Sequence, residues 1–176
     1  MEIESYPLRR KRKEELKNLY ESSFPQKERT PFSILMLRCK SKMVNLLIFT
    51  ENNNMVGFSY LIKKDRHLLI LYLAVKEDLR DKGYGSRILY DIKEKYKDHA
   101  IALFFVNNDR RKNFYIKNGF EIEGYSYIDR GLEYKLMKRG DNFDRKKLNK
   151  LIKGFSFGLV SLDRRKVPTT NNSLHL

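Results

Sequence analysis

The segment Gly83-Tyr84-Gly85 stands between an apolar run that ends at Val75 and an amphipathic stretch that follows it. A helix that begins at such a point leaves its first backbone N–H groups unpaired, and its dipole adds positive potential there. Glycines lack the side chains that would block a ligand, while Arg80 and Lys82 add countercharge. This combination of residues predicts a binding site for an anion such as a pyrophosphate.

The spacing of these glycines differs from the two common nucleotide-binding loops. A Walker loop requires G-x-x-x-x-G-K-[ST] and a dinucleotide fold requires G-x-G-x-x-G, whereas Gly85 is followed by Ser86, Arg87 and Ile88. A tight turn that only begins a helix is the structural alternative. The glycines alone do not decide between these two interpretations.

Hydrophobic spacing upstream of the glycines predicts two helices and then three strands. The first helix is indicated by four apolar residues on one face, Leu16, Leu19, Tyr20 and Phe24. Thr30 and Pro31 indicate the N-cap and the first helical position of the second helix. Apolar runs at hairpin-like spacing predict antiparallel strands over residues 44–51, 55–64 and 67–75.

Downstream of the glycines, helical and extended patterns alternate. Ile88, Leu89, Ile92 and Tyr96 form the apolar face of a helix, and a strand is expected over residues 100–106. A short helix that stops at Gly119 and a closing hairpin complete the pattern. The predicted order is α-α-β-β-β-α-β-α-β-β, an α/β (α+β) fold with a mixed, mostly antiparallel central sheet flanked by helices.

Two motifs resemble one known family. "LAV", four residues and then "RDKGYGSRIL" resembles the R-x-x-G-x-G/A signature of the GNAT family of N-acetyltransferases. The segment "NNDRRKNFYIKNGF", residues 107–120, is similar to the N-x(6)-Y-x-x-x-G-F segment of that family. Arg110 is a departure, because the family often has a small residue there. The resemblance spans roughly residues 1–139 and implies a GNAT-like fold.

The resemblance also implies an activity and a set of site residues. Acetyl-CoA would be the cosubstrate, without a metal, and a primary amine would attack its thioester directly in a ternary complex. Tyr115 would be the general acid, although packing is its structural alternative. Asn108 would contact CoA or cap its helix, and the backbone of Leu73 and Val75 would hold the pantetheine and the acetyl group. The residues assigned to acetyl-CoA are Leu73, Val75, Arg80, Asp81, Lys82, Gly83, Gly85, Ser86 and Asn108.

The sequence does not name a general base. Some relatives carry a glutamate on the strand before the loop, but "LLILYLAV" contains no acid. Glu28 is one candidate, and solvation explains it equally well. Tyr60 and Tyr72 either line the acceptor cleft or belong to the core. His67, His99, His175 and Cys39 lack the spacing of metal ligands.

The charge of the chain is high and uneven. It has 37 Lys+Arg against 22 Asp+Glu, a formal charge of +15, and residues 138–176 hold ten of the cations against three Asp. We therefore expect a GNAT-like domain over residues 1–139 and a basic, partly helical C-terminal extension over residues 140–176. The apolar spacing of "NFDRKKLNKLIKGF" favours packing on the domain or in a homodimer over docking on nucleic acid.

Cellular location and partners follow from what the sequence lacks. The single cysteine excludes an internal disulfide, and neither a signal peptide nor an apolar run of the ~20 residues that span a bilayer is found. We expect a cytoplasmic enzyme that acts on a small-molecule or peptide amine. The alternative is a non-catalytic protein on the same fold that binds acyl-CoA or docks on nucleic acid.

Overall fold

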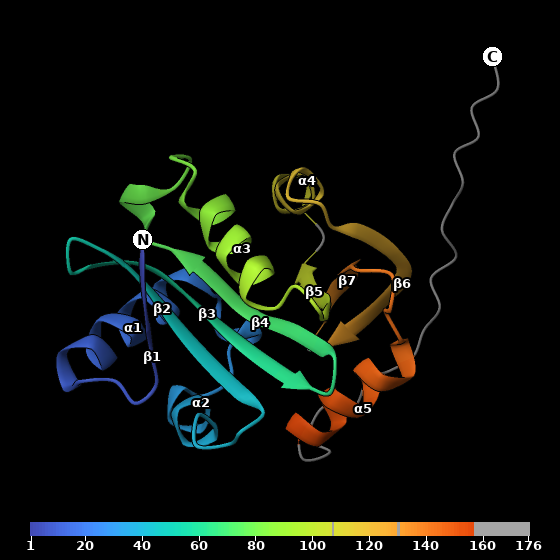
Figure 1. The fold of residues 1–176 in the computed structure, drawn as a ribbon, viewed down its shortest axis with the longest axis horizontal. Helices are drawn as coiled ribbons and strands as arrows, with labels where there is room; N and C mark the ends of the chain where they lie inside the picture. Colours follow the sequence, from blue (N-terminus) through green and yellow to red (C-terminus); the bar gives the residue numbers. More distant parts are fainter. Residues whose placement is uncertain (107, 130, 157–176) are drawn as a thin grey trace.

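A single seven-stranded sheet organises the protein. The computed structural model describes residues 1–106, 108–129 and 131–156. In these ranges the strands follow the order β1-β2-β3-β4-β5-β7-β6, and all neighbours are antiparallel except β4 and β5. Helices lie against both faces of the sheet (Figure 1). The predicted fold class, a mixed and mostly antiparallel sheet flanked by helices, is confirmed.

The elements alternate along the chain much as the apolar runs predict. The strands are β1 (Glu2–Ser5), β2 (Val44–Glu51), β3 (Asn54–Lys64), β4 (His67–Val75), β5 (Ala100–Val106), β6 (Glu121–Asp129) and β7 (Leu132–Arg139). The α-helices are α1 (Arg10–Ser23), α2 (Phe32–Arg38), α3 (Tyr84–Lys95), α4 (Asp109–Lys117) and α5 (Arg145–Ser156). Short 3₁₀ helices η1 (Gln26–Glu28) and η2 (Glu77–Leu79) precede α2 and α3.

Two local differences from the predicted order have simple causes. Strand β1 was not predicted, because "EIES" is short and mostly polar; it pairs by its backbone with the edge of β2. The N-cap of α2 is Pro31 and not Thr30, so the helix begins one residue later than expected. Thr30 is instead held by Tyr72, whose hydroxyl accepts a hydrogen bond from the Thr30 N–H at 3.1 Å.

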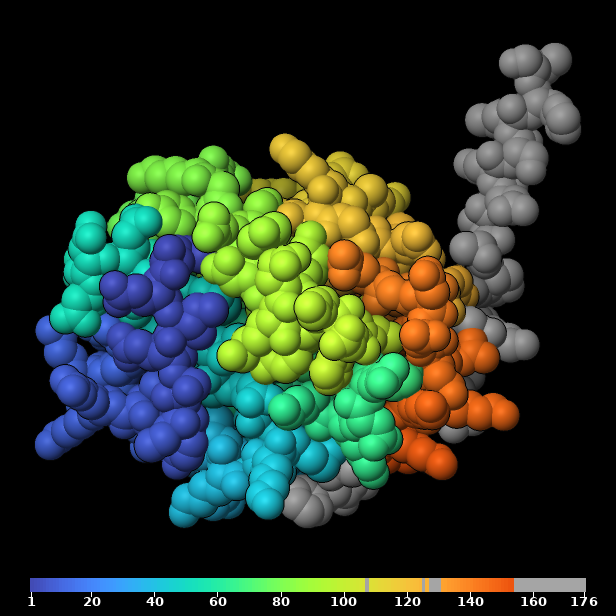
Figure 2. All heavy atoms as spheres, viewed as in Figure 1, coloured from blue at the N-terminus to red at the C-terminus, as the bar shows by residue number. Residues whose placement is uncertain are grey.

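The sheet separates two hydrophobic cores. The first core joins α1, α2 and α5 to one face, and the second core joins α3 and the aromatic side of α4 to the other. Figure 2 shows α3 in yellow-green between the N-terminal segment in blue and the β7 and α5 end in orange. Helix α5 contributes Leu148, Leu151 and Ile152 to the first core, and the first two are each 1% exposed. The expected division at residue 139 therefore separates a helix from the core on which it packs.

A fork between β4 and β5 opens the sheet at its centre. The two strands pair in parallel only from His67–Ile70 to Ala100–Leu103. The register between β3 and β4 then shifts, because Tyr60 pairs with Tyr72 and Leu61 with Ile70, which leaves Leu71 as an extra residue. Such a bulge bends a strand and increases its twist. The ends of β4 and β5 consequently separate, with space between them.

Candidate active site

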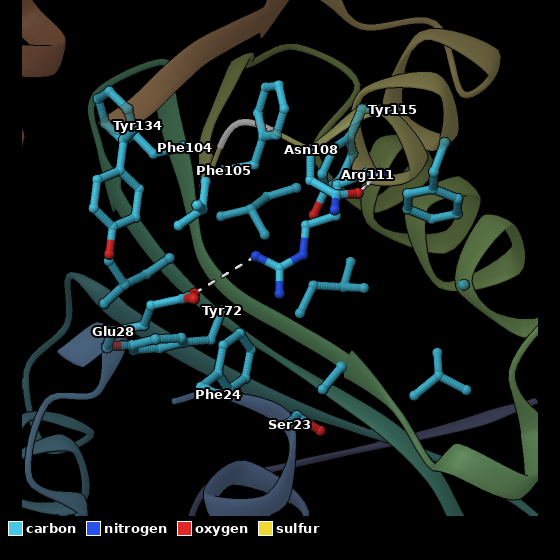
Figure 3. A pocket seen from close by; sticks show the side chains of 18 of the residues that line it. Ser23, Phe24, Glu28, Tyr72, Phe104, Phe105, Asn108, Arg111, Tyr115 and Tyr134 are labelled. Carbon is cyan, nitrogen blue, oxygen red and sulfur yellow. Dashed lines mark hydrogen bonds and ion pairs between the residues drawn. The ribbon is translucent and has the colours of Figure 1, made fainter. Parts of the chain in front are cut away.

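The fork between β4 and β5 is the floor of a cleft of about 1180 Å³. Its walls come from the start of α3, from α4, and from the loop between α1 and α2 (Figure 3). Nine of the ten predicted site residues line this cleft, namely Leu73, Val75, Arg80, Asp81, Gly83, Gly85, Ser86, Asn108 and Tyr115. Lys82 does not line it, although it belongs to the same loop and is exposed.

The two positions of the loop require glycine for different structural reasons. Gly83 is the N-cap of α3 with φ of 86°, and a Cβ there would meet nothing within 4 Å. Its backbone conformation requires glycine, and the space in front of it stays open. A Cβ at Gly85 would lie 3.1 Å from the ring of Phe114, so this glycine lets α3 approach α4 closely. No side chain caps the N-terminus of α3, which leaves its first N–H groups available to an anion.

Charged side chains frame this helix N-terminus. The Nε of Arg80 donates to the carbonyl oxygen of Val75 at 3.2 Å, which holds the guanidinium beside the end of β4. Asp81 has φ of 60°, and its exposed carboxylate pairs with Arg110 of α4 at 2.7 Å. Arg110, the departure from the family pattern, thus links α4 to the glycine loop. An anion bound at α3 would meet the backbone of Asp81 more favourably than its carboxylate.

The edge of β4 after Ile70 is not paired with β5 and provides main-chain groups. The N–H of Lys76 donates to the carbonyl of Val56 in β3 at 2.9 Å. Since successive residues of a strand point their peptide groups in opposite directions, the peptide groups of Leu73 and Val75 face away from β3, toward the cleft. These are the two residues from which we expected backbone contacts.

Tyr115 forms part of the cleft wall. Its ring lies in an aromatic cluster with Phe105, Phe114 and Phe120. Burial raises the pKa of Tyr115 to about 12, although the nearby charge of Arg111 opposes the shift. The hydroxyl is therefore protonated at neutral pH and can act as a proton donor.

Asn108 caps α4, as one of its two expected roles requires. Its side-chain oxygen accepts a hydrogen bond from the backbone N–H of Arg111 at 3.3 Å. This bond satisfies one of the unpaired donors at the start of α4. The cap fixes the helix that carries both Arg111 and Tyr115.

The end of the cleft away from the glycine loop carries an ion pair. An oxygen of Glu28, in η1, lies 3.6 Å from a nitrogen of Arg111, in α4. Arg111 reaches across the cleft toward Glu28 in Figure 3. Arg111 was not predicted as a site residue, although its position four residues before Tyr115 places the two side chains on the same helical face.

Of three other candidate residues from the sequence, Tyr72, Tyr60 and Cys39, only the first lines the cleft. Tyr72 lines the cleft, but Tyr60 does not: it is buried, and its hydroxyl donates to the carbonyl of Leu35 at 3.0 Å. Cys39 is also buried away from the cleft, and burial raises the pKa of its thiol to about 11. A thiol with such a pKa is a poor nucleophile at neutral pH.

The described ranges contain neither a cluster of metal ligands nor a helix able to cross a membrane. Within residues 1–106, 108–129 and 131–156, no group of three or more His, Cys, Asp or Glu side chains is arranged to hold a metal ion. None of the helices described has the length and apolar character needed to cross a membrane.

Comparison with known proteins gives the family. Residues 44–122, from β2 to the start of β6, match the model of the acetyltransferase (GNAT) domain. The chain contains a GNAT domain. The matched range includes the glycine loop, β5 and α4, so the predicted family is confirmed on the segment that forms most of the cleft.

Solved structures share the fold of this GNAT domain. A putative GNAT acetyltransferase from Bacteroides thetaiotaomicron has a TM-score of 0.71 and 24% identity, covering 87% of this chain and 95% of that one. A Bacillus subtilis acetyltransferase in complex with CoA has a TM-score of 0.61 and 21% identity, covering 77% and 95%.

A curated relative matches a short part of the chain. The tRNA(Met) cytidine acetyltransferase TmcA 2 of Saccharolobus solfataricus is 39% identical over 54 residues, which are 29% of this chain and 7% of that protein. The chain therefore matches less than a tenth of the length of this curated relative.

Proposed function

We propose that this protein is an N-acetyltransferase that transfers the acetyl group of acetyl-CoA to a primary amine in a ternary complex. One observation carries the proposal: three groups meet in a single cleft. They are the uncapped N-terminus of α3 with Gly83 at a positive φ, the edge of β4 that is not paired with β5, and the protonated hydroxyl of Tyr115. These groups lie in a GNAT domain, and a neighbour of the same fold was solved with CoA.

The glycine loop fits the pyrophosphate of acetyl-CoA. The space before Gly83 is open, and the first N–H groups of α3 together with the Arg80 guanidinium supply donors for an anion. Ser86 lies in the first turn of α3 and lines the same space. Asp81 contributes through its backbone, since its carboxylate pairs with Arg110, and Lys82 adds charge from outside the cleft lining.

Residues of the fork would hold and activate the reacting groups. Acetyl-CoA supplies an acetyl group on a thioester with a thiolate as leaving group. The peptide N–H groups of Leu73 and Val75 orient the carbonyl and stabilise negative charge on its oxygen as the amine attacks. As the C–N bond forms and the C–S bond breaks, the hydroxyl of Tyr115, which is protonated at neutral pH, would donate its proton to the departing sulfur. The nitrogen would lose a proton to solvent water, and solvent would restore the proton of the tyrosine.

The acceptor is a small-molecule or peptide amine. A second candidate is an exocyclic amine of a nucleic acid, which is supported by the formal charge of +15 and by the name of the curated relative, a tRNA cytidine acetyltransferase. Both candidates present nitrogen to the same thioester. They differ in the charge that surrounds the amine.

An acceptor screen tests the proposal. The protein is incubated with acetyl-CoA and panels of small amines, peptides and RNA transcripts, while free CoA thiol is measured by absorbance and acetylated products by mass spectrometry. We expect amine-dependent thiol release by the wild type and strongly reduced release by Tyr115→Phe. Tight binding of acetyl-CoA without turnover on any panel would favour the non-catalytic acyl-CoA-binding alternative.

A further inference from the structure

Glu28 carries a mostly buried carboxylate that is poorly satisfied by its own chain. Its side chain is 12% exposed, and its ion pair with Arg111 is 3.6 Å long, which exceeds hydrogen-bond length. Within the described ranges the carboxylate accepts no hydrogen bond. By contrast, Arg12 donates to Glu4 at 2.8 Å in a network that packs β1 against α1. A buried charge with one loose partner is costly unless a ligand completes its coordination.

The loop that carries Glu28 is held in place by tyrosines. The Tyr72 hydroxyl donates to the carbonyl of Glu28 at 3.0 Å and accepts the N–H of Thr30 at 3.1 Å. The Tyr20 hydroxyl donates to the carbonyl of Thr30 at 2.8 Å. These bonds fix the backbone at Glu28, the last residue of η1, and at Thr30, two residues beyond it. Glu28 therefore faces the cleft from a fixed loop, as a binding residue requires.

Aromatic rings line the part of the cleft that this carboxylate faces. Four rings line the same end of the cleft, those of Phe24, Tyr72, Phe104 and Tyr134. In Figure 3 they surround the space into which Glu28 points. A single carboxylate among aromatic rings suits an ammonium group, because both the negative charge and the ring faces attract a cation.

Arg111 occupies the space between the two functional walls. It arises from α4 one helical turn before Tyr115 and extends across the cleft to Glu28. Its side chain is 43% exposed, so the guanidinium is held by one loose pair and can move into solvent. An amine that approaches a thioester beside Tyr115 must enter the space that this guanidinium now fills.

We propose that Glu28 is the subsite that first binds the acceptor as an ammonium ion, and that the Arg111 guanidinium is an internal stand-in which the acceptor displaces. The bound ammonium then loses one proton to solvent water, and the neutral amine attacks the thioester. This inference rests on the proposed function and narrows the acceptor to a cationic primary amine on an apolar or aromatic body. An acceptor amine carried on an anionic body would instead gain from Arg111. Removing Arg111 therefore has opposite effects on the two classes.

Three small probes of similar shape separate these classes. Phenethylamine is cationic, 2-phenylethanol is neutral and phenylacetate is anionic. Their affinities are measured by NMR chemical-shift titration of the full chain, as wild type and as Glu28→Gln, Arg111→Gln and Lys112→Gln. Lys112→Gln is the matched control, because it removes a neighbouring charge of α4 that does not line the cleft. Thermal unfolding and calorimetric binding of acetyl-CoA are recorded for each protein.

The expected result is specific to the cation. Glu28→Gln should weaken phenethylamine binding by about tenfold, since a charge-assisted contact is lost. Arg111→Gln should strengthen it by about two- to fivefold, the range for removing a competing exposed ion pair. Lys112→Gln should leave it unchanged, and 2-phenylethanol should be insensitive to Glu28→Gln.

Several results would overturn the inference. Weaker phenethylamine binding by Arg111→Gln would contradict the stand-in role, as would an equal gain for 2-phenylethanol. Phenylacetate that binds best to the wild type and is lost in Arg111→Gln would identify an anionic acceptor. If no protein binds phenethylamine while acetyl-CoA still binds, the subsite is refuted and the proposed function stands. If the wild type itself does not bind acetyl-CoA, the proposed function is refuted instead.

Discussion

Replacing Leu151 by alanine tests whether α5 belongs to the folded domain. Leu151 is 1% exposed and packs in the first core beside Leu148 and Ile152. Truncating a buried leucine removes its transfer free energy and leaves a cavity, at a cost of about 3 kcal/mol. For a chain of this size each kcal/mol lowers Tm by roughly 3 °C. We therefore expect Leu151→Ala to lower Tm by about 10 °C.

The assay is thermal unfolding of the full chain, followed by circular dichroism at neutral pH. Lys150→Ala is the matched control, because this neighbouring side chain is exposed and its removal leaves the core intact. Lys150→Ala should change Tm by no more than about 2 °C, as is usual for surface substitutions. A Leu151→Ala variant that unfolds at the same temperature as Lys150→Ala would show that α5 does not complete the core, and that the division at residue 139 is a true domain boundary.

Three further predictions concern chemistry, pH and packing. Tyr115→Phe should lower kcat about 10²-fold with little change in acetyl-CoA affinity, in steady-state assays with an acceptor found by the screen; unchanged kcat would return the residue to packing. Burial lowers the pKa of His67, whose Nε2 accepts the N–H of Asp144 at 3.1 Å, and the pKa of His99 is lowered in the same direction. Below about pH 6.5 these histidines bind more protons in the unfolded chain than in the folded protein. Their contribution to the free energy of unfolding should therefore be complete above that pH and be lost as the pH falls through the folded pKa. His67→Gln should weaken this pH dependence in urea titrations. Gly57→Ala should cost about 2 kcal/mol or more, because its Cβ would overlap a carbonyl oxygen of β4, and an unaltered urea midpoint would contradict that packing.

Much of the fold follows from local sequence patterns. The apolar runs of residues 44–51, 67–75 and 100–106 predict β2, β4 and β5 with their observed bounds, since turn-forming residues interrupt them sharply. Strand β1 escaped prediction because its polar residues gain order from pairing with β2 and not from burial. The packing of α5 in the first core also depends on tertiary contact. Its amphipathic spacing predicts a buried face but does not indicate which surface that face covers.

The site was predicted on one side only. The glycine loop follows from residue type and spacing, because a helix N-terminus that binds an anion is a local feature. The opposite end depends on contacts between segments distant in sequence, such as the pair of Glu28 and Arg111. No local pattern indicates that the loop before α2 faces α4 across a fork in the sheet. Tyr60 and Tyr72 illustrate the same limit, since alike residues on neighbouring strands have different surroundings.

Calorimetric titration of acetyl-CoA into the wild type, Gly83→Asp and Gly131→Asp tests the central claim most directly. Gly131 is the matched control, because it too has a positive φ of 79° with open space around it, but it does not line the cleft. We expect micromolar binding by the wild type and by Gly131→Asp. Gly83→Asp should weaken binding about tenfold or more, since a carboxylate would fill the phosphate site and repel its ligand. Equal affinity of Gly83→Asp and the wild type would contradict the account.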